Sequence, residues 1–478
     1  MEIPVKKNES YVVDIIDQGY EGEGIAKIEG YTVFVPSAIK GETCKILIVK
    51  ITASHGFGKL LEIIQTSKDR IETDCITYKR CGGCSLRHMK YETTLNLKKD
   101  IVQNLVNKTL DNKIEVKLTI GMEQPYYYRN KAQYPIGYDK QGNITTGIFA
   151  NRSHEIIPMQ GCKIQHPVSE LIAKLVVDFL NENHISSYNE ATRNGLFRHV
   201  VVKVGKTTKE IMCILVINGE KFPKEQELVK YLLSNFLEKI TNKNEHYADN
   251  KTEDYSKYTI KTIVKNINNQ NTNVILGNKN IALYGEGYIY DKLGEYTFKI
   301  SPMSFYQTNP VQTEILYAKA IEAAELRKED IALDLYCGIG TIGIYASSFV
   351  KRVYGIEIVE QAIQDAKENA QLNHIENVEF ICGDVEKALT DLLEQRRIQP
   401  NVIFVDPPRR GIDKTTIQNI LKVKPEKLVY ISCNPATMVR DLKQLEEKYN
   451  IKEIQPVDMF PFTSHVECIA VLQLKQEM

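Results

Sequence analysis

The sequence has no long apolar run and no surplus of charge of either sign. No stretch approaches the roughly 18 apolar residues that a membrane-spanning helix needs, which excludes a transmembrane protein. The first residues, MEIPVKKNESY, lack the apolar core of a secretory signal, so we expect a cytoplasmic protein without a membrane partner. Lysine plus arginine equals aspartate plus glutamate, at 61 each, so the net charge neither favours nor excludes binding to nucleic acid.

The chain contains ten cysteines, and a reducing cytoplasm keeps such residues as thiols rather than disulfides. Some of them are therefore candidates for catalysis or metal binding. With 478 residues, of which 43% are hydrophobic, the chain is long enough for about three domains with cores of their own.

Three sequence patterns follow one another along the chain. Residues 8–64 consist of short strand-like segments between glycine-rich turns, which predicts a small, OB-like β-barrel. The next part combines a cysteine cluster, a helical stretch at 91–110 and a mixed α+β region, in which the polar segment 242–258 is predicted to be an exposed loop. The third part alternates strands with helices, which is typical of an α/β, Rossmann-like doubly wound sheet. Its predicted strands are 331–336, 352–358, 378–383, 401–406 and 427–432, with a helix at 360–373. The predicted domains are residues 1–64, 65–300 and 301–478.

A cofactor site is predicted at the end of the first strand of the third part, in the motif DLYCGIGTIG (334–343). Gly338 and Gly340 allow the backbone to approach a ligand, and the helix that follows presents free N–H groups. Glu357, at the end of the second predicted strand, can accept hydrogen bonds from both ribose hydroxyls of an adenosine group. Nucleotide, dinucleotide and S-adenosylmethionine sites share this layout, and the residues downstream decide against hydride chemistry.

Two neighbouring strands of the third part end in residues that can react. Asp406 follows the fourth predicted strand and Cys433 the fifth, and doubly wound sheets place their sites at the carboxyl ends of strands. Cys433 lies in a polar Ser-Cys-Asn-Pro turn, which exposes it as a candidate nucleophile. Near the C-terminus, Glu467 is a candidate general base, whereas we expect His465 to be structural. Five other cysteines are predicted to be buried and unreactive: Cys44, Cys213, Cys337, Cys382 and Cys468.

A cysteine beside a methyl-donor site indicates methylation of a pyrimidine at C5. An exocyclic amine can attack a methyl group directly, but C5 becomes nucleophilic only after a thiolate has added to C6. The methylated adduct then needs a base that removes the C5 proton, so that the thiolate can leave. The target base has to leave its stack to reach the cysteine, so we expect a flipped or looped-out base.

Six motifs together resemble the bacterial RNA (uracil-5-)-methyltransferase family, which includes ribosomal-RNA and tRNA enzymes. In chain order they are SFYQTNP (304–310), DLYCGIGTIG (334–343), GIEIVEQAI (355–363), DPPRRG (406–411), SCNPAT (432–437) and SHVE (464–467). Upstream, residues 8–64 resemble the TRAM domain, a small RNA-binding barrel.

The resemblance implies roles for particular residues of this chain. Cys433 would attack C6 of uracil, Glu467 would take the C5 proton, and Asp406 would bind the uracil edge. The implied cofactor is S-adenosylmethionine. The residues expected to line the S-adenosylmethionine and uracil sites are Gln307, Tyr336, Gly338, Gly340, Glu357 and Asp406.

Four further cysteines have a spacing that is typical of a metal or cluster site. Cys75, Cys81 and Cys84 form a C-x5-C-x2-C motif, and Cys162 adds a distant fourth thiol. Four thiolates can hold a [4Fe–4S] cluster or a zinc ion, and spacing alone does not decide between them. The resemblance implies a [4Fe–4S] cluster, because ribosomal-RNA members of the family share this pattern.

A local excess of positive charge accompanies these cysteines, with 11 Lys or Arg against 7 Asp or Glu in residues 71–135. It suggests an RNA-contacting face near the cysteines. The cations expected on that face are Lys79, Arg80, Arg87 and Lys90. The aromatic run 126–128, beside Arg129 and Lys131, fits base stacking and core packing equally well.

The function predicted from the sequence is C5 methylation of a uridine in 23S ribosomal RNA by a monomeric enzyme. A tRNA (uracil-C5)-methyltransferase is an alternative. The cysteine spacing and Cys433 disfavour a radical-SAM-type RNA-modifying enzyme. The intact set of Cys433, Glu467 and Asp406 disfavours a non-catalytic RNA-binding factor.

Overall fold

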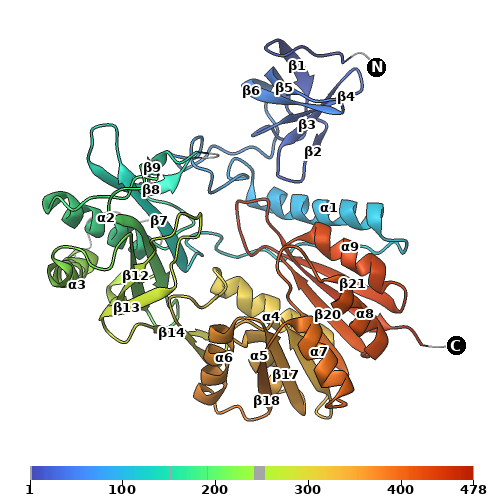
Figure 1. Ribbon diagram of the computed structural model, residues 1–478. Helices are drawn as coiled ribbons and strands as arrows, with labels where there is room; N and C mark the ends of the chain where they lie inside the picture. Colours follow the sequence, from blue (N-terminus) through green and yellow to red (C-terminus); the bar gives the residue numbers. More distant parts are fainter. Residues whose placement is uncertain (1–2, 151–152, 191, 242–252, 477–478) are drawn as a thin grey trace.

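The computed structural model describes residues 3–150, 153–190, 192–241 and 253–476. Their strands form a six-stranded N-terminal sheet, two seven-stranded sheets and a two-stranded ribbon. In Figure 1 the N-terminal sheet stands apart from the two larger sheets, and helix α1 (Tyr91–Thr109) lies below it. Among the described residues, no helix is both long enough and apolar enough to cross a membrane.

The N-terminal sheet has the strand order β1-β5-β6-β4-β3-β2. Alternate side chains of a strand face opposite sides of a sheet, and in β4 the inward set is Tyr31, Val33 and Val35, all buried. The strand-rich architecture predicted for 8–64 is therefore confirmed. The strands are β1 Ser10–Asp14, β2 Asp17–Gln18, β3 Gly24–Ile28, β4 Tyr31–Val35, β5 Thr43–Ile51 and β6 His55–Gln65.

Helix α1 packs against the C-terminal part of the chain. It confirms the helix predicted at 91–110, and its buried residues recur every three or four positions, as expected for one face of a helix. Val102 and Val106 of this face pack into the same core as Met438 and Leu442 of helix α9 (Pro435–Leu445). A segment from early in the chain thus becomes part of the C-terminal core.

The central sheet has the strand order β13-β12-β11-β10-β7-β8-β9, and helices α2 and α3 share one core with it. Residues 242–252 of the predicted exposed loop lie outside the described residues. The prediction of an exposed loop is wrong for its end, because Tyr255 and Tyr258 are buried against the ring of His166. The elements are β7 Lys131–Tyr138, β8 Ile144–Phe149, β9 Ile156–Pro158, α2 Pro167–Glu182, β10 Phe197–Val204, β11 Glu210–Ile217, α3 Glu225–Thr241, η1 Tyr255–Lys257, β12 Thr259–Ile267 and β13 Lys279–Tyr284.

The C-terminal sheet is doubly wound, as predicted, with the order β18-β17-β16-β19-β20-β22-β21. All five predicted strands are present and parallel. Two further strands complete one edge: β22 runs antiparallel to β20, and β21 pairs antiparallel with β22. The two-stranded ribbon consists of β14 Ile289–Leu293 and β15 Tyr296–Ile300. The elements that follow it are α4 Pro310–Ala324, β16 Ile331–Leu335, α5 Thr341–Ser347, β17 Arg352–Glu357, α6 Glu360–Leu372, β18 Val378–Cys382, α7 Val385–Glu394, β19 Val402–Val405, α8 Lys414–Val423, β20 Lys427–Ser432, α9 Pro435–Leu445, β21 Tyr449–Val457 and β22 Glu467–Leu474.

Candidate active site

The antiparallel strand β22 brings Glu467 opposite Cys433. Ser432, the last residue of β20, pairs with Cys468 of β22. The next position on each strand is Cys433 on one side and Glu467 on the other, so the two side chains stand at the same end of the ladder. Asp406 directly follows β19, the parallel neighbour of β20. The three candidate catalytic residues therefore meet at the carboxyl edge of the sheet.

The acidic groups at this edge hold their protons more strongly than usual. Burial raises the pKa of Glu467 to about 8, with the charge of Asp406 adding to the effect and Arg409 opposing it. Burial also raises the pKa of Asp406 to about 7 and that of Cys433 to about 11. The carboxylates of Glu467 and Asp406 contribute to the raised pKa of Cys433, and Arg409 lowers it. At neutral pH the free site thus has a thiol at Cys433 and a largely protonated Glu467.

Arg409 supplies positive charge to this site and is held there by the start of helix α9. The carbonyl oxygen of Arg409 accepts hydrogen bonds from Asn434 Nδ2 at 3.1 Å and Thr437 Oγ1 at 3.2 Å. Its side chain is exposed. The sequence analysis did not single out Arg409, although its place three residues after Asp406 in the DPPRRG motif is a usable signal.

The glycine loop after β16 is arranged around two acidic residues. Asp334, which is fully buried, accepts a hydrogen bond from the backbone N–H of Gly343 at 2.8 Å. Glu357 accepts one from Gly338 N at 3.2 Å and one from Val359 N at 3.0 Å. A Cβ at Gly338 would meet no atom within 4 Å, which leaves open space beside the Glu357 carboxylate. An acceptor next to such a backbone cradle fits the adenosyl group of S-adenosylmethionine.

Two other predicted cofactor residues also lie near this loop. Tyr336 has a left-handed backbone, with φ of +66°, and its hydroxyl donates to Asp413 Oδ2 at 3.3 Å. The carbonyl oxygen of Gln307 accepts a hydrogen bond from Asn130 Nδ2 at 3.0 Å. Asn130 belongs to the central part of the chain, so the cofactor region is braced from outside the C-terminal sheet.

Tyr317 of helix α4 is a residue of this region that the sequence analysis missed. Its hydroxyl lies 3.2 Å from Thr341 Oγ1 of the glycine loop, and its side chain also hydrogen-bonds Gln307. Burial raises the pKa of Tyr317, and the nearby carboxylate of Asp406 raises it further. Tyr317 therefore joins the predicted cofactor residues to the catalytic edge. Its position on the buried face of a helix was the only signal in the sequence.

The prediction of a [4Fe–4S] cluster is wrong for this structure. The four cysteines lie in one region, since Cys75, Cys81 and Cys162 all contribute to the raised pKa of Cys84. Nevertheless, the described residues contain no group of three or more His, Cys, Asp or Glu side chains placed to hold a metal ion. Burial raises the pKa of Cys84 to about 12 and that of Cys162 to about 11.

The cysteine segment instead makes local contacts. Cys81 Sγ accepts a hydrogen bond from Gly83 N at 3.3 Å, and Cys75 Sγ lies 3.4 Å from Thr77 Oγ1. Cys81 also forms an isolated β-bridge with Ala150 of the central part. The segment thus contributes hydrogen bonds and one β-bridge to the packing of this region.

Several other expectations are corrected by burial. Arg87 is not on an RNA-contacting surface, because it is buried, paired with Asp74 at 2.7 Å and stacked 4.6 Å from the ring centroid of Phe462. Tyr128 is buried, whereas Tyr126 is 41% exposed, so the aromatic run divides between packing and surface.

The prediction that Cys382 is buried fails, and His465, which was predicted to be structural, lies at the surface. Cys382 is exposed, while the other four cysteines predicted to be inert are buried. His465 is exposed as well, and its ring lies edge-on to Phe460 at 6.1 Å between centroids.

The doubly wound sheet, the glycine loop with Glu357, and the cysteine at a strand end define an S-adenosylmethionine-dependent class of methyltransferases. Residues 246–475 match the tRNA (uracil-5-)-methyltransferase family, and residues 4–61 match the TRAM domain. The chain belongs to the RNA (uracil-5-)-methyltransferase family, with an N-terminal TRAM domain.

Similar proteins cover the full length of the chain. It is 43% identical to an uncharacterized RNA methyltransferase of Oceanobacillus iheyensis over 475 residues, which is 99% of this chain and 98% of that protein. Identity to an uncharacterized RNA methyltransferase of Staphylococcus epidermidis is 42%, covering 99% of each chain. The crystal structure of the Pyrococcus abyssi tRNA (uracil-54, C5)-methyltransferase in complex with S-adenosyl-L-homocysteine has a TM-score of 0.74 at 25% identity. It covers 96% of this chain and 99% of that one.

Proposed function

We propose that this enzyme methylates C5 of a uridine in large-subunit ribosomal RNA through a covalent adduct between Cys433 and C6. The observation that carries the proposal is the position of Cys433 opposite Glu467 at the end of the β20–β22 ladder, with Asp406 on the neighbouring strand. S-adenosylmethionine supplies an electrophilic methyl group. Glu357, the backbone at Gly338 and Gly340, Tyr336 and Gln307 are the residues that would hold it.

Each residue has a defined role in the proposed reaction. The Cys433 thiolate adds to C6, and the electron pair of the C5–C6 double bond moves toward C5 and the C4 carbonyl. Asp406 binds the uracil edge and supports this enolate. After C5 has gained its methyl group, Glu467 removes the C5 proton, the double bond re-forms and the thiolate leaves C6. Arg409 favours both ionised groups, because its charge lowers the pKa of Cys433 and of Glu467.

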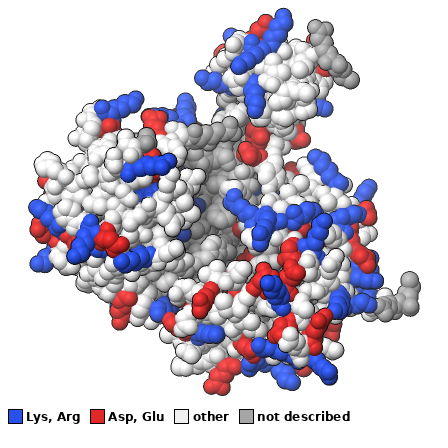
Figure 2. Space-filling model, viewed as in Figure 1, with Lys and Arg blue, Asp and Glu red and all other residues white. Residues whose placement is uncertain are grey.

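An RNA substrate suits the whole molecule. The surface is hollowed between the part that carries the central sheet and the part that carries α9, and Lys and Arg gather over α1 and α9 beside this hollow (Figure 2). In this proposal, residues 1–64 bind RNA, residues 65–300 form a central domain that supports the site, and residues 301–478 carry out methyl transfer. It implies a monomeric enzyme of the cytoplasm.

A tRNA substrate is the second candidate, favoured by the similarity to the Pyrococcus abyssi tRNA enzyme. The TRAM domain and the resemblance to the ribosomal-RNA branch favour rRNA. Nucleoside mass spectrometry after incubation with labelled S-adenosylmethionine distinguishes the two, using unmodified large-subunit rRNA and tRNA transcripts side by side. Labelled 5-methyluridine in rRNA supports the proposal. Label in tRNA alone supports the tRNA substrate instead, and label in neither RNA overturns the proposal. The Cys433→Ala variant is expected to be inactive on both RNAs, and full activity in it overturns the covalent mechanism.

A further inference from the structure

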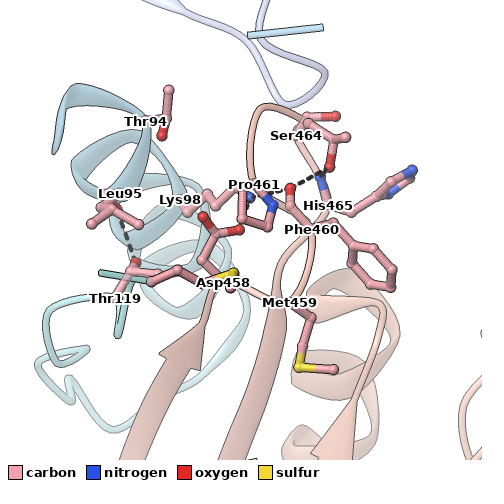
Figure 3. A network of polar contacts seen from close by, with 12 residues as sticks. Thr94, Leu95, Lys98, Thr119, Asp458, Met459, Phe460, Pro461, Ser464 and His465 are labelled. Carbon is pink, nitrogen blue, oxygen red and sulfur yellow. Dashed lines mark hydrogen bonds and ion pairs between the residues drawn. The ribbon is translucent and has the colours of Figure 1, made fainter. Parts of the chain in front are cut away.

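An ion pair closed off from solvent joins helix α1 to the loop before Glu467. Lys98 Nζ lies 2.5 Å from Asp458 Oδ1, and both side chains are fully buried. The hydroxyl of Tyr91, on the same helix, donates to Asp458 Oδ2 at 2.8 Å. Figure 3 shows Lys98 reaching from α1 to the carboxyl group of Asp458, while the ring of His465 points away from the pair. The two partners are 360 residues apart in the chain.

A buried ion pair needs an explanation other than stability. Removing two charges from water costs free energy that their attraction often fails to recover, so apolar residues of similar volume serve a core at least as well. The cost is visible at Lys98, whose pKa is lowered by burial. The established use of such pairs is to specify one arrangement of chain segments over others.

The segment held by this pair is the loop 458–466, between β21 and β22, and it is fastened along its length. Each backbone carbonyl oxygen from residue 458 to residue 462 accepts a hydrogen bond from a residue outside the loop. The donors are Gln312 Nε2 to Asp458 at 3.1 Å, Asn309 Nδ2 to Met459 at 3.0 Å, Lys98 Nζ to Phe460 at 3.1 Å, the Tyr128 hydroxyl to Pro461 at 3.2 Å, and the backbone N–H groups of Ser85 and Leu86 to Phe462 at 3.0 and 2.9 Å.

The loop also holds a backbone conformation that its own sequence disfavours. Phe462 has a φ of +64°, which is uncommon for a bulky side chain and persists only when the surroundings impose it. Its ring is covered by the guanidinium of Arg87 and lies 5.4 Å from the ring of Tyr126. The surroundings of the loop, rather than local preference, therefore determine its path.

The two ends of the loop meet at the residue that takes the proton in the proposed reaction. Val457, directly before Asp458, pairs with Glu467 across β21 and β22. A displacement of Asp458 is therefore transmitted through one pair of strand residues to Glu467. Glu467 in turn stands opposite Cys433, so a small shift changes the distance from its carboxylate to the C5 proton.

We propose that Lys98, Asp458 and Tyr91 are positioning residues, which anchor the loop 458–466 so that Glu467 can remove the C5 proton from the methylated adduct. The inference rests on the proposed function. In the step concerned, the Glu467 carboxylate accepts the C5 proton, the C–H electron pair forms the C5–C6 double bond, and the C6–S bond breaks to return the Cys433 thiolate. Loosening the anchor slows this step more than it slows the formation and methylation of the adduct.

The test separates the steps of one turnover in the full-length protein with RNA and S-adenosylmethionine. In Asp458→Asn and Lys98→Met, we expect a methylated RNA–protein adduct to accumulate on denaturing gels. Release of 5-methyluridine RNA should be slowed about tenfold or more, because proton transfer by a misplaced base is inefficient. Tyr91→Phe removes one hydrogen bond to Asp458 and should show the same effect more weakly, which provides a second reading if a charge variant does not fold.

Lys99→Met is the matched control, because Lys99 lies on the same helix and, within the described part of the chain, its one ion pair is a long contact of 3.9 Å with the exposed Glu115. It should accumulate no adduct. Equal slowing of adduct formation and release in the Lys98, Asp458 and Tyr91 variants indicates a merely structural role and overturns the inference, as does release at the wild-type rate. If the wild-type protein makes no 5-methyluridine, the proposed function itself is overturned. The wild type is measured first, so this outcome is distinguished from a failure of the inference.

Discussion

At the scale of single residues, the protonation states of Glu467 and Cys433 determine what the candidate site can do. In the proposed reaction Glu467 and Cys433 both act in their ionised forms, yet burial raises the pKa of Glu467 to about 8 and that of Cys433 to about 11. Neighbouring carboxylates add to both shifts, and Arg409 reduces them. The balance among these few charges sets the pH range in which the enzyme can work.

The rate of methylation is therefore expected to rise with pH across the neutral range. With a pKa of about 8, Glu467 is about one-tenth ionised at pH 7 and about nine-tenths ionised at pH 9, and the thiolate fraction of Cys433 rises over the same range. The measurement is kcat/KM for RNA between pH 6.5 and 9. A profile that is flat or falls between pH 7 and pH 9 contradicts the assignment.

Arg409→Gln should move this profile to higher pH, because removing the guanidinium raises the pKa of both Cys433 and Glu467. Arg410→Gln, the adjacent and likewise exposed arginine, is the matched control. Profiles of the two variants that coincide would show that Arg409 has no specific electrostatic role.

Glu467→Gln should change the pH dependence of folding as well as that of catalysis. A carboxyl whose pKa is raised from 4.5 to about 8 on folding binds a proton more tightly in the folded protein, so its contribution to stability is lost as pH rises through that interval. Between pH 5 and pH 8, the Tm of the wild type should consequently fall more steeply than that of the variant. In the proposed reaction this variant also lacks the base that removes the C5 proton, so the methylated RNA–protein adduct should persist. Parallel Tm curves mean that Glu467 ionises normally in the folded state.

At the scale of elements, the cofactor region depends on a tight junction between a loop and a helix. Gly340 has a φ of +82°, and a Cβ there would lie 2.5 Å from the ring of Phe380 on β18. Both the backbone conformation and the close approach therefore require glycine at this position.

Gly340→Ala should abolish S-adenosylmethionine binding, because the loop must move away from Phe380 to accommodate the methyl group. Gly30→Ala is the matched control, since Gly30 has a similar φ of +84° but no neighbour within 4 Å. The control should lose about 1–3 kcal/mol of stability from backbone strain alone. Calorimetric titration with S-adenosylmethionine and thermal unfolding of both variants provide the comparison. Normal cofactor affinity in Gly340→Ala contradicts the assignment of the loop.

At the scale of the whole molecule, the N-terminal sheet approaches the catalytic edge. Tyr20, in the turn between β2 and β3, is 47% exposed. Partial burial raises its pKa, the nearby Cys468 and Cys433 raise it further, and the nearby Arg409 lowers it. In the same turn, Gly22 packs so closely on Leu86 that a Cβ would lie 2.3 Å from the Leu86 side chain. The TRAM domain thus presents an aromatic ring near Arg409 and Cys433.

Tyr20→Ala is expected to raise the KM for RNA and leave the affinity for S-adenosylmethionine unchanged, because stacking of one base on an aromatic ring is worth about 1–3 kcal/mol. Tyr284→Ala is the matched control, since Tyr284 is 42% exposed on strand β13 of the central sheet. RNA binding that weakens equally in both variants, or in neither, excludes a specific contact by Tyr20.

Local patterns in the sequence were sufficient for much of this molecule. Side-chain alternation and glycine turns predicted the N-terminal strands, the five parallel strands and helix α1, because each pattern is repeated within one element. Motifs with short spacing likewise indicated Cys433, Asp406, Glu357 and the glycine loop, since each of them directly follows a strand or lies at its end.

Other features depend on contacts between distant segments and appear only in the tertiary structure. The antiparallel pairing that sets Glu467 opposite Cys433, the Lys98–Asp458 pair and the role of Tyr317 all join elements that no local spacing relates. The cysteine spacing suggested a cluster, but metal binding requires side chains placed around one point, and the described residues do not provide that arrangement. Burial, which raises the pKa values at the catalytic edge, is likewise a property of the packed molecule, because it depends on which elements exclude water from each group.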